Sequence, residues 1–384
     1  MKRLECLDGL RGALAVYVLF GHMAPFATLP AWLQDGVSHG EAAVDMFFIL
    51  SGLVITQSLD RAGGRAVPFL MARAARIFPV FVPVFVVAVL IQPGSCGFDR
   101  MPWIGPDNAA RTICVTDWPH AWPAAIAAHL TMTHGLLPNG VLPHVWVSFL
   151  GAAWSLSTEW QFYLLALLAS RGGASRLTGG LMLLAIVGVA WQQATPESWQ
   201  FSRAFLANKA HFFALGVASL AVVRQRRGAL VIYGVTLAAS LAVCASYAMF
   251  GKMLPPLVWT LCLTVQMRQA TPGLRWFAGL LRCQAAQYLG AISYCIYLVN
   301  EPIHKVLAAT LSRLADGDPV VFTALWLPSA IVLPILLSAW LHTHVEMPAL
   351  RWGRGAAGAA LRARLPVGAR IPAAPATARS TRSS

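Results

Sequence analysis

An arginine and a histidine lie on one face of the first long apolar stretch, L-D-G-L-R-G-A-L-A-V-Y-V-L-F-G-H, as Arg11 and His22. In a helix, the eleven steps between them, each of about 100°, end within roughly 20° of a whole number of turns. Ionisable groups are costly inside a bilayer, so they usually face a protein interior and serve chemistry there. This pair therefore predicts a polar functional site within a helical bundle.

Further polar residues interrupt later apolar stretches. They occur in E-A-A-V-D-M-F-F-I-L-S-G-L (Asp45, Ser51), R-A-A-R-I-F-P (Arg73, Arg76), W-S-L-S-T-E-W-Q-F-Y (Glu159, Tyr163), L-G-A-I-S-Y-C-I-Y-L-V-N-E-P (Ser293, Tyr297, Asn300) and H-V-E-M-P near the end of the last apolar stretch. Such residues need partners when they are buried.

The composition is that of a membrane protein. Of the 384 residues, 57% are hydrophobic and 11% are charged, against a charged fraction of about 25% in soluble domains. Apolar runs such as 78–91 and 234–250 approach the length that crosses a hydrocarbon layer of about 30 Å. Because backbone groups there find no water, these runs must be helices. The expected fold class is an all-α integral membrane protein.

The hydropathy pattern predicts about ten transmembrane helices bundled around a polar cavity. The expected ranges are 9–28, 42–60, 77–92, 145–169, 178–194, 203–222, 229–249, 255–267, 286–308 and 321–346. With this arrangement most of the 29 lysines and arginines fall on the side of the N-terminus, which indicates that both termini are cytoplasmic. The same rule explains the net charge of +14, so we expect no nucleic-acid partner.

Residues 1–350 form the predicted membrane domain, and residues 351–384 form a basic tail that we expect to be disordered near anionic lipid. The only long outer segment is 93–144, in which 122–137 is either an interfacial or a re-entrant helix. Cys96 and Cys114 lie in this segment, and the sequence leaves open whether they form a disulfide.

The motifs together resemble the acyltransferase 3 family, the bacterial multi-pass membrane acyltransferases that modify surface glycans and other hydroxyl-bearing molecules. The resemblance extends over residues 7–350. Its most specific parts are LDGLRG with the following histidine, VDMFFILSG, the RxxR of Arg73 and Arg76, WSLSTEWQFY and ISYCIYL. It implies a location in the bacterial inner membrane. One departure is Asn300, where the family commonly has a histidine; asparagine forms hydrogen bonds but cannot titrate.

The resemblance implies that His22 is the catalytic histidine. Histidine accepts a proton near neutral pH, so we expect a general base, with a covalent acyl-imidazole as the competing route. Arg11 either stabilises developing oxyanion charge or pairs with Asp8. Asp45 and Glu159 complete the expected catalytic set, and either could orient His22 or hold Arg11.

Arg73 and Arg76 fit a donor site, because guanidinium groups bind the phosphates of coenzyme A in a bidentate manner. The alternative is that positive-inside topology alone places them at the cytoplasmic edge. Substrate contacts are expected from the motif residues Tyr163, Ser293, Tyr297 and Asn300. No spacing of ligands indicates a metal.

The sequence therefore predicts a membrane O-acyltransferase. It would move an acyl group, most simply acetyl, from cytoplasmic acyl-coenzyme A to a hydroxyl of a carbohydrate or cell-surface glycan. The alternative is a proton-coupled transporter or flippase of a polar solute or glycan, since intramembrane Asp45, Glu159 and His22 could form a proton relay. Transporter folds often have internal symmetry, and the sequence has none that we detect.

Overall fold

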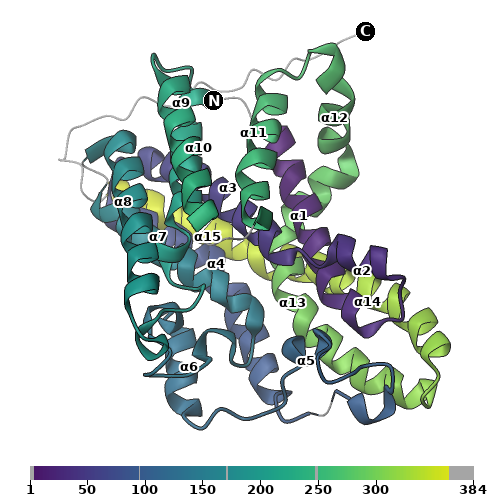
Figure 1. Ribbon diagram of the computed structural model, residues 1–384. Helices are drawn as coiled ribbons and strands as arrows, with labels where there is room; N and C mark the ends of the chain where they lie inside the picture. The colour runs from purple at the N-terminus through teal and green to yellow at the C-terminus, as the bar shows by residue number, and fades with distance from the viewer. Residues whose placement is uncertain (1–3, 95, 170–171, 247–249, 363–384) are drawn as a thin grey trace.

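The computed structural model describes residues 4–94, 96–169, 172–246 and 250–362. These residues form helices joined by loops, with no strand among them and one isolated β-bridge between Pro138 and Phe201 (Figure 1). The expected all-helical fold is therefore confirmed for this part of the chain.

Each of the ten expected ranges contains a helix. In chain order these are α1 (Glu5–Met23), α3 (Gly40–Arg61), α4 (Ala66–Leu90), α7 (Trp154–Leu168), α8 (Gly173–Ala194), α9 (Ala210–Val223), α10 (Ala229–Ser246), α11 (Leu254–Met267), α13 (Gln284–Ala315) and α14 (Pro319–Leu341). Among the described residues, five helical stretches are long and apolar enough to cross a membrane, namely Ala31–Arg61, Ala66–Leu90, Gly173–Ala194, Ala229–Ser246 and Pro319–Gly353. The chain is thus a multi-pass helical membrane protein, while the count of ten spans stays a prediction.

The bundle has two distinct ends, which Figure 1 shows at its top and bottom. We call the end that carries α12 (Pro272–Arg282) the α12 end, and the opposite end, which carries the 93–144 segment, the loop end. A disulfide joins Cys96 to Cys114 in that segment, which answers the question that the sequence left open. The segment also contains α6 (Trp122–Leu130), a short helix in the range where we expected an interfacial or re-entrant one.

Helices α1 and α13 pack side by side and start at the same end of the bundle. Small residues allow this close approach: a Cβ atom added to Gly12 would lie 2.7 Å from the carbonyl oxygen of Ala286. Backbones that approach through glycines are typical of helix pairs in membranes. The parallel alignment of α1 with α13 brings His22 beside Asn300.

The expected helix over 145–169 begins late, at Trp154. Two 3₁₀ turns, Val145–Val147 and Gly151–Ala153, precede α7, and the backbone turns sharply between them at Phe149, whose φ is 63°. The positive φ interrupts helical geometry, and the amides of the second turn bind a carboxylate instead of continuing a helix upstream.

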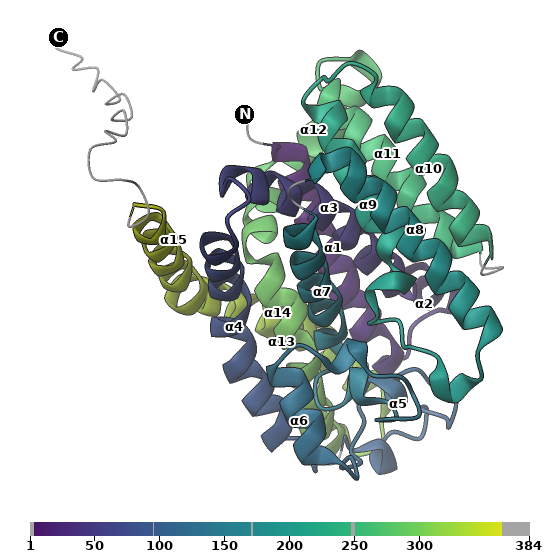
Figure 2. The ribbon, with the colours of Figure 1, turned by 90° about the vertical axis from the view of Figure 1, so that its left-hand side faces the viewer.

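The chain after α14 is also helical. A π-helical turn, His342–Glu346, leads into α15 (Met347–Arg362), so residues 351–362 are not disordered as we expected. Alanine and arginine favour helices, and α15 packs on α4 where Gly353 faces Ala75. Figure 2 shows α15 on the outside of the bundle beside α4. The expectation of disorder for residues 363–384 lies outside the described residues.

Candidate active site

A cavity of about 620 Å³ lies between α1, α3, α4, α7 and α13, with the start of α15 as part of its wall. Five charged side chains from three helices, α1, α4 and α7, line it: Asp8, Arg11, Arg73, Arg76 and Glu159. The bundle therefore encloses the polar cavity that the sequence predicts, and it gathers there four of the six residues expected to act in catalysis or donor binding.

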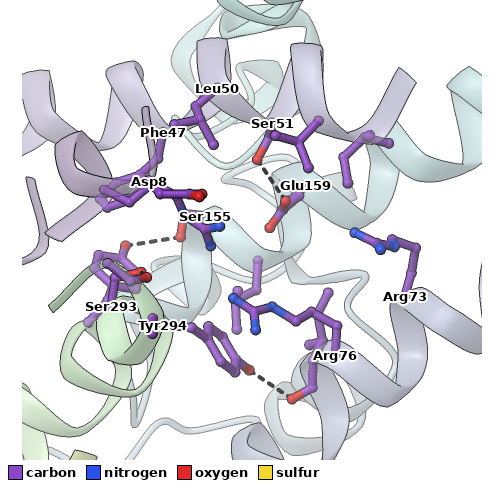
Figure 3. A pocket seen from close by; sticks show the side chains of 18 of the residues that line it. Asp8, Phe47, Leu50, Ser51, Arg73, Arg76, Ser155, Glu159, Ser293 and Tyr294 are labelled. Carbon is purple, nitrogen blue, oxygen red and sulfur yellow. Dashed lines mark hydrogen bonds between the residues drawn. The ribbon is translucent and has the colours of Figure 1, made fainter. Parts of the chain in front are cut away.

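Glu159 and Ser51 face each other across this cavity. The Ser51 hydroxyl donates a hydrogen bond of 2.7 Å to Oε1 of Glu159 (Figure 3). Glu159 also interacts electrostatically with Arg11. Two roles were considered for Glu159, to orient His22 or to hold Arg11. Glu159 lines the same cavity as Arg11, so it lies where its charge can hold that guanidinium group.

Arg73 and Arg76 project from consecutive turns of α4 into the cavity, as Figure 3 shows, but their partners differ. Nη1 of Arg76 donates to the carboxylate of Glu346, a fully buried residue of the π-helical turn. Glu346 also accepts from Nδ1 of His342 at 2.7 Å. Arg73 instead lies over the ring of Tyr163, with its guanidinium carbon 6.0 Å from the ring centroid.

Two guanidinium groups in the cavity have an unused donor. The Nε atoms of Arg11 and Arg73 are buried and have no hydrogen-bond partner among the described residues. A buried donor that stays unsatisfied costs about 1–3 kcal/mol, so a native structure rarely leaves one without a reason. Both atoms line a cavity large enough for a ligand, and an anion would satisfy them.

Tyr297, Ser155 and Phe47 also line the cavity, and we call these three residues the cavity floor. The Ser155 hydroxyl donates to the Tyr297 hydroxyl oxygen at 3.0 Å, and the rings of Phe47 and Tyr297 lie 6.4 Å apart. Ser293 is buried beside them and donates to the carbonyl of Gly290 in its own helix at 2.9 Å. Tyr163, Ser293 and Tyr297 therefore all line the cavity, as expected of substrate contacts.

His22 lies beyond this floor, toward the loop end. Its ring is half-buried, and it does not line the cavity that contains the arginines. The polar cavity predicted for the bundle therefore contains Arg73 and Arg76 but not His22 in this conformation.

Asn300 determines which nitrogen of His22 is free. Its Nδ2 donates to the carbonyls of Ile296 at 2.9 Å and Tyr297 at 2.7 Å, so its Oδ1 must be the atom that faces Nδ1 of His22 at 2.6 Å. Nδ1 is then the donor, and Nε2 keeps its lone pair. Asn300 thus orients the ring of His22, and this role needs only a hydrogen-bond acceptor, not a titratable group.

Asp45 has a different partner from those we expected. Its Oδ1 accepts a bond of 2.7 Å from Nζ of Lys209, and both residues are buried. Lys209 also binds Glu41 at 2.9 Å. Asp45 therefore neither orients His22 nor holds Arg11, because a lysine 164 residues further along the chain occupies its carboxylate.

Two acidic residues near the site were not among the predicted site residues. Glu346 belongs to the H-V-E-M-P motif, and Glu301 follows Asn300 directly. Both carboxylates are held by groups from distant parts of the chain, Glu346 by Arg76 and Glu301 by the amides of Gly151 and Ala152. The only signal in the sequence was their place in otherwise apolar stretches close to a proline.

The site thus consists of apolar helices that carry arginines, carboxylates and a histidine oriented by Asn300. The family model described as an acyltransferase domain, that of the acyltransferase 3 family, matches residues 4–343, and the chain belongs to this family. No curated protein and no solved structure matches the chain.

Proposed function

We propose that this membrane acyltransferase takes an acyl group, most simply acetyl, from cytoplasmic acyl-coenzyme A and transfers it to a hydroxyl of a carbohydrate or glycan. The observation that carries the proposal is a pair of buried Nε atoms, of Arg11 and Arg73, that have no hydrogen-bond partner within the described part of the chain and belong to residues lining the 620 Å³ cavity. Charge-assisted hydrogen bonds to phosphate are the strong kind that arginine forms best.

Arg73 and Arg11 can contact the phosphates of acyl-coenzyme A without losing a protein ion pair. Arg76 cannot, because it already binds Glu346. In the proposed complex the phosphates lie at the level of these two arginines. Arg76 either exchanges Glu346 for a phosphate or keeps the start of α15 in place as one wall of the cavity.

The spacing along α1 suits a donor with a long arm. Arg11 and His22 are eleven residues apart, which is about 16 Å along a helix. A donor whose phosphates bind Arg11 would thus present its thioester near His22 only by passing between Tyr297, Ser155 and Phe47. We infer that these side chains move when the acyl group enters.

The chemistry then follows from the orientation of His22. Nε2 takes the proton of the acceptor hydroxyl while the hydroxyl oxygen attacks the thioester carbonyl carbon. The carbon–sulfur bond breaks, the new ester forms, and the imidazolium returns the proton to the departing thiolate. Asn300 keeps Nδ1 protonated, so that Nε2 is the basic atom throughout.

We place the α12 end in the cytoplasm and the loop end outside, in the inner membrane of a bacterium. Arginines exposed at the α12 end, such as Arg226, Arg227 and Arg275, support this orientation through the positive-inside rule. The donor then enters from the cytoplasm, and the acceptor reaches His22 from the side of the disulfide-bonded segment.

The test uses the full chain in nanodiscs with radiolabelled acetyl-coenzyme A and candidate glycans. We expect label in the glycan with the wild type and a loss of about 10²–10⁴-fold in His22→Ala. His120→Ala, which removes an exposed histidine of the outer segment, is the matched control and should keep full activity. Transfer that survives in His22→Ala contradicts the assigned base, and solute uptake without donor consumption would favour a transporter.

A further inference from the structure

Glu301 is held in place on the far side of the cavity floor. Its Oε1 accepts from the amide of Gly151 and its Oε2 from the amide of Ala152, each at 3.0 Å. These amides belong to the 3₁₀ turn that precedes α7, so the carboxylate joins α13 to the turn through two bonds. Both oxygens are fixed by neutral groups, and the negative charge of the carboxylate is not cancelled by them.

His22 and Lys305 are the ionisable groups whose charge acts on Glu301. Glu301 directly follows Asn300, whose Oδ1 lies 2.6 Å from Nδ1 of His22. Lys305, one turn further along α13, donates to the carbonyls of Gln92 at 2.8 Å and Val115 at 2.9 Å, so its ammonium is directed at the start of the outer segment.

The other titratable groups nearby have partners of their own. His304 faces α14, where its Nε2 lies 3.0 Å from the carbonyl oxygen of Ala330. From α3, Glu41 and Asp45 bind Lys209, and Arg203 binds Glu41 at 3.1 Å. None of these groups forms an ion pair with Glu301 in the part of the chain that the structure describes, so the carboxylate is available to a positive charge formed on His22.

We propose that Glu301 is a positioning residue for acyl transfer, whose fixed carboxylate stabilises the imidazolium that forms when His22 takes the acceptor proton. The inference rests on the function proposed above. Asn300 and Glu301 then divide two tasks: Asn300 sets the tautomer by a neutral hydrogen bond, and Glu301 supplies the charge. A carboxylate preorganised in this way stabilises the transition state without rearranging.

A purely structural role for Glu301 makes a different prediction. If the residue only anchors the turn before α7, Glu301→Gln should weaken that anchor, because the glutamine Nε2 cannot accept from one of the two amides, but the protonation of His22 should stay as in the wild type. If the charge matters, Glu301→Gln should also move the protonation of His22 to lower pH in a folded protein. Glu197→Gln, at an exposed position, is the control for the loss of a carboxylate alone.

The first measurement is the dependence of transfer on pH. In Glu301→Gln we expect the maximal rate to fall about tenfold and the acid limb of the pH–activity profile to move about one unit lower, since a tenfold effect corresponds to one pH unit. The profile of Glu197→Gln should match that of the wild type. A Glu301→Gln profile that overlays the wild type would overturn the inference.

The second measurement does not depend on activity. Diethyl pyrocarbonate modifies neutral imidazole, and mass spectrometry of the peptide that contains His22 gives the rate at each pH. We expect half-maximal labelling of His22 at a lower pH in Glu301→Gln than in the wild type. An unchanged midpoint would contradict the role of Glu301 even if the wild type transfers acyl groups, whereas a shifted midpoint in a chain without transferase activity would count against the proposed function alone.

Discussion

Buried charged side chains gather in two regions of this bundle, and they are satisfied in opposite ways. Lys209 has two carboxylate partners within the protein, Asp45 at 2.7 Å and Glu41 at 2.9 Å. In the cavity, the Nε atoms of Arg11 and Arg73 have no hydrogen-bond partner among the described residues. Buried charge therefore has two uses here. The cluster of Lys209, Asp45 and Glu41, which we call the Lys209 cluster, joins α3 to the start of α9, while the cavity keeps hydrogen-bond donors available to a ligand.

The comparison predicts its largest effect at Lys209. Removing one partner of a buried ion pair leaves an uncompensated charge and costs about 3–5 kcal/mol. We therefore expect Lys209→Met to lower the free energy of unfolding by about that amount, measured by denaturant titration in detergent micelles. The double variant Lys209→Met/Asp45→Leu should recover much of the loss. A Lys209→Met protein as stable as the wild type would remove the distinction between the two regions.

A third buried polar pair is His129 with His134 in the outer segment, and burial keeps both rings neutral. Their rings stack with centroids 4.1 Å apart. Burial lowers the pKa of His134 to about 4, against the upward effect of its bonds to the carbonyls of Ala153 and Ala128. Burial, and then the charge of His134, lower the pKa of His129 well below its ordinary value.

The sign of the pH effect follows from these lowered values. Below the ordinary histidine pKa of about 6.5, the unfolded chain binds protons that the folded chain excludes, so stability is lost as the pH falls. We expect each histidine to remove ~1.4 kcal/mol per pH unit, down to about pH 4 for His134. Thermal unfolding of His129→Phe should depend less on pH than the wild type, and the exposed His120→Asn should not differ from it.

Arg73 should give the reverse of the result at Lys209. Arg73→Ala removes a donor whose Nε has no hydrogen-bond partner in the described ranges, so we expect the free energy of unfolding to change by less than about 1 kcal/mol. Affinity for coenzyme A should fall about 10- to 100-fold, or about 1.4–2.8 kcal/mol, through the lost charge-assisted bonds. Calorimetric titration measures this, with the exposed Arg226→Ala as control. Equal affinity in both variants would contradict a donor role for Arg73.

The smallest effect is expected at the rim of the Lys209 cluster. The side chains of Arg203 and Glu41 are 44% and 33% exposed, and Glu41 keeps Lys209 and Lys252 when Arg203 is removed. Exposed ion pairs contribute about 0–1 kcal/mol. Arg203→Ala should therefore lower the free energy of unfolding by less than about 1 kcal/mol in the same denaturant titration. A loss comparable to that of Lys209→Met would show that the exposure of an ion pair does not determine its contribution to stability here.

The sequence predicts the helices well, because apolar length and composition are local properties. Each of the ten predicted ranges contains a helix, and polar residues of α1, α4 and α7 line a common cavity. His22, which the spacing places on the same face of α1 as Arg11, does not line that cavity. The expected start at residue 145 was wrong because Phe149 adopts a positive φ, which hydropathy cannot indicate.

The partners of the buried charges could not be predicted in the same way. Asp45 with Lys209, Arg76 with Glu346 and His22 with Asn300 are pairs separated by 164, 270 and 278 residues. Which of several carboxylates meets a given cation depends on how each helix is rotated and which helices are neighbours. A single sequence contains the residues but not that arrangement, so Asp45 was assigned to the wrong partners.

The most direct test of the account is where the donor binds. A cryo-electron microscopy map of the full chain with acetyl-coenzyme A should show phosphate density within hydrogen-bond distance of Arg11 and Arg73, with the thioester arm directed toward Tyr297 and His22. At saturating donor, density for the phosphates at any other place on the protein, with this cavity unchanged, would contradict it.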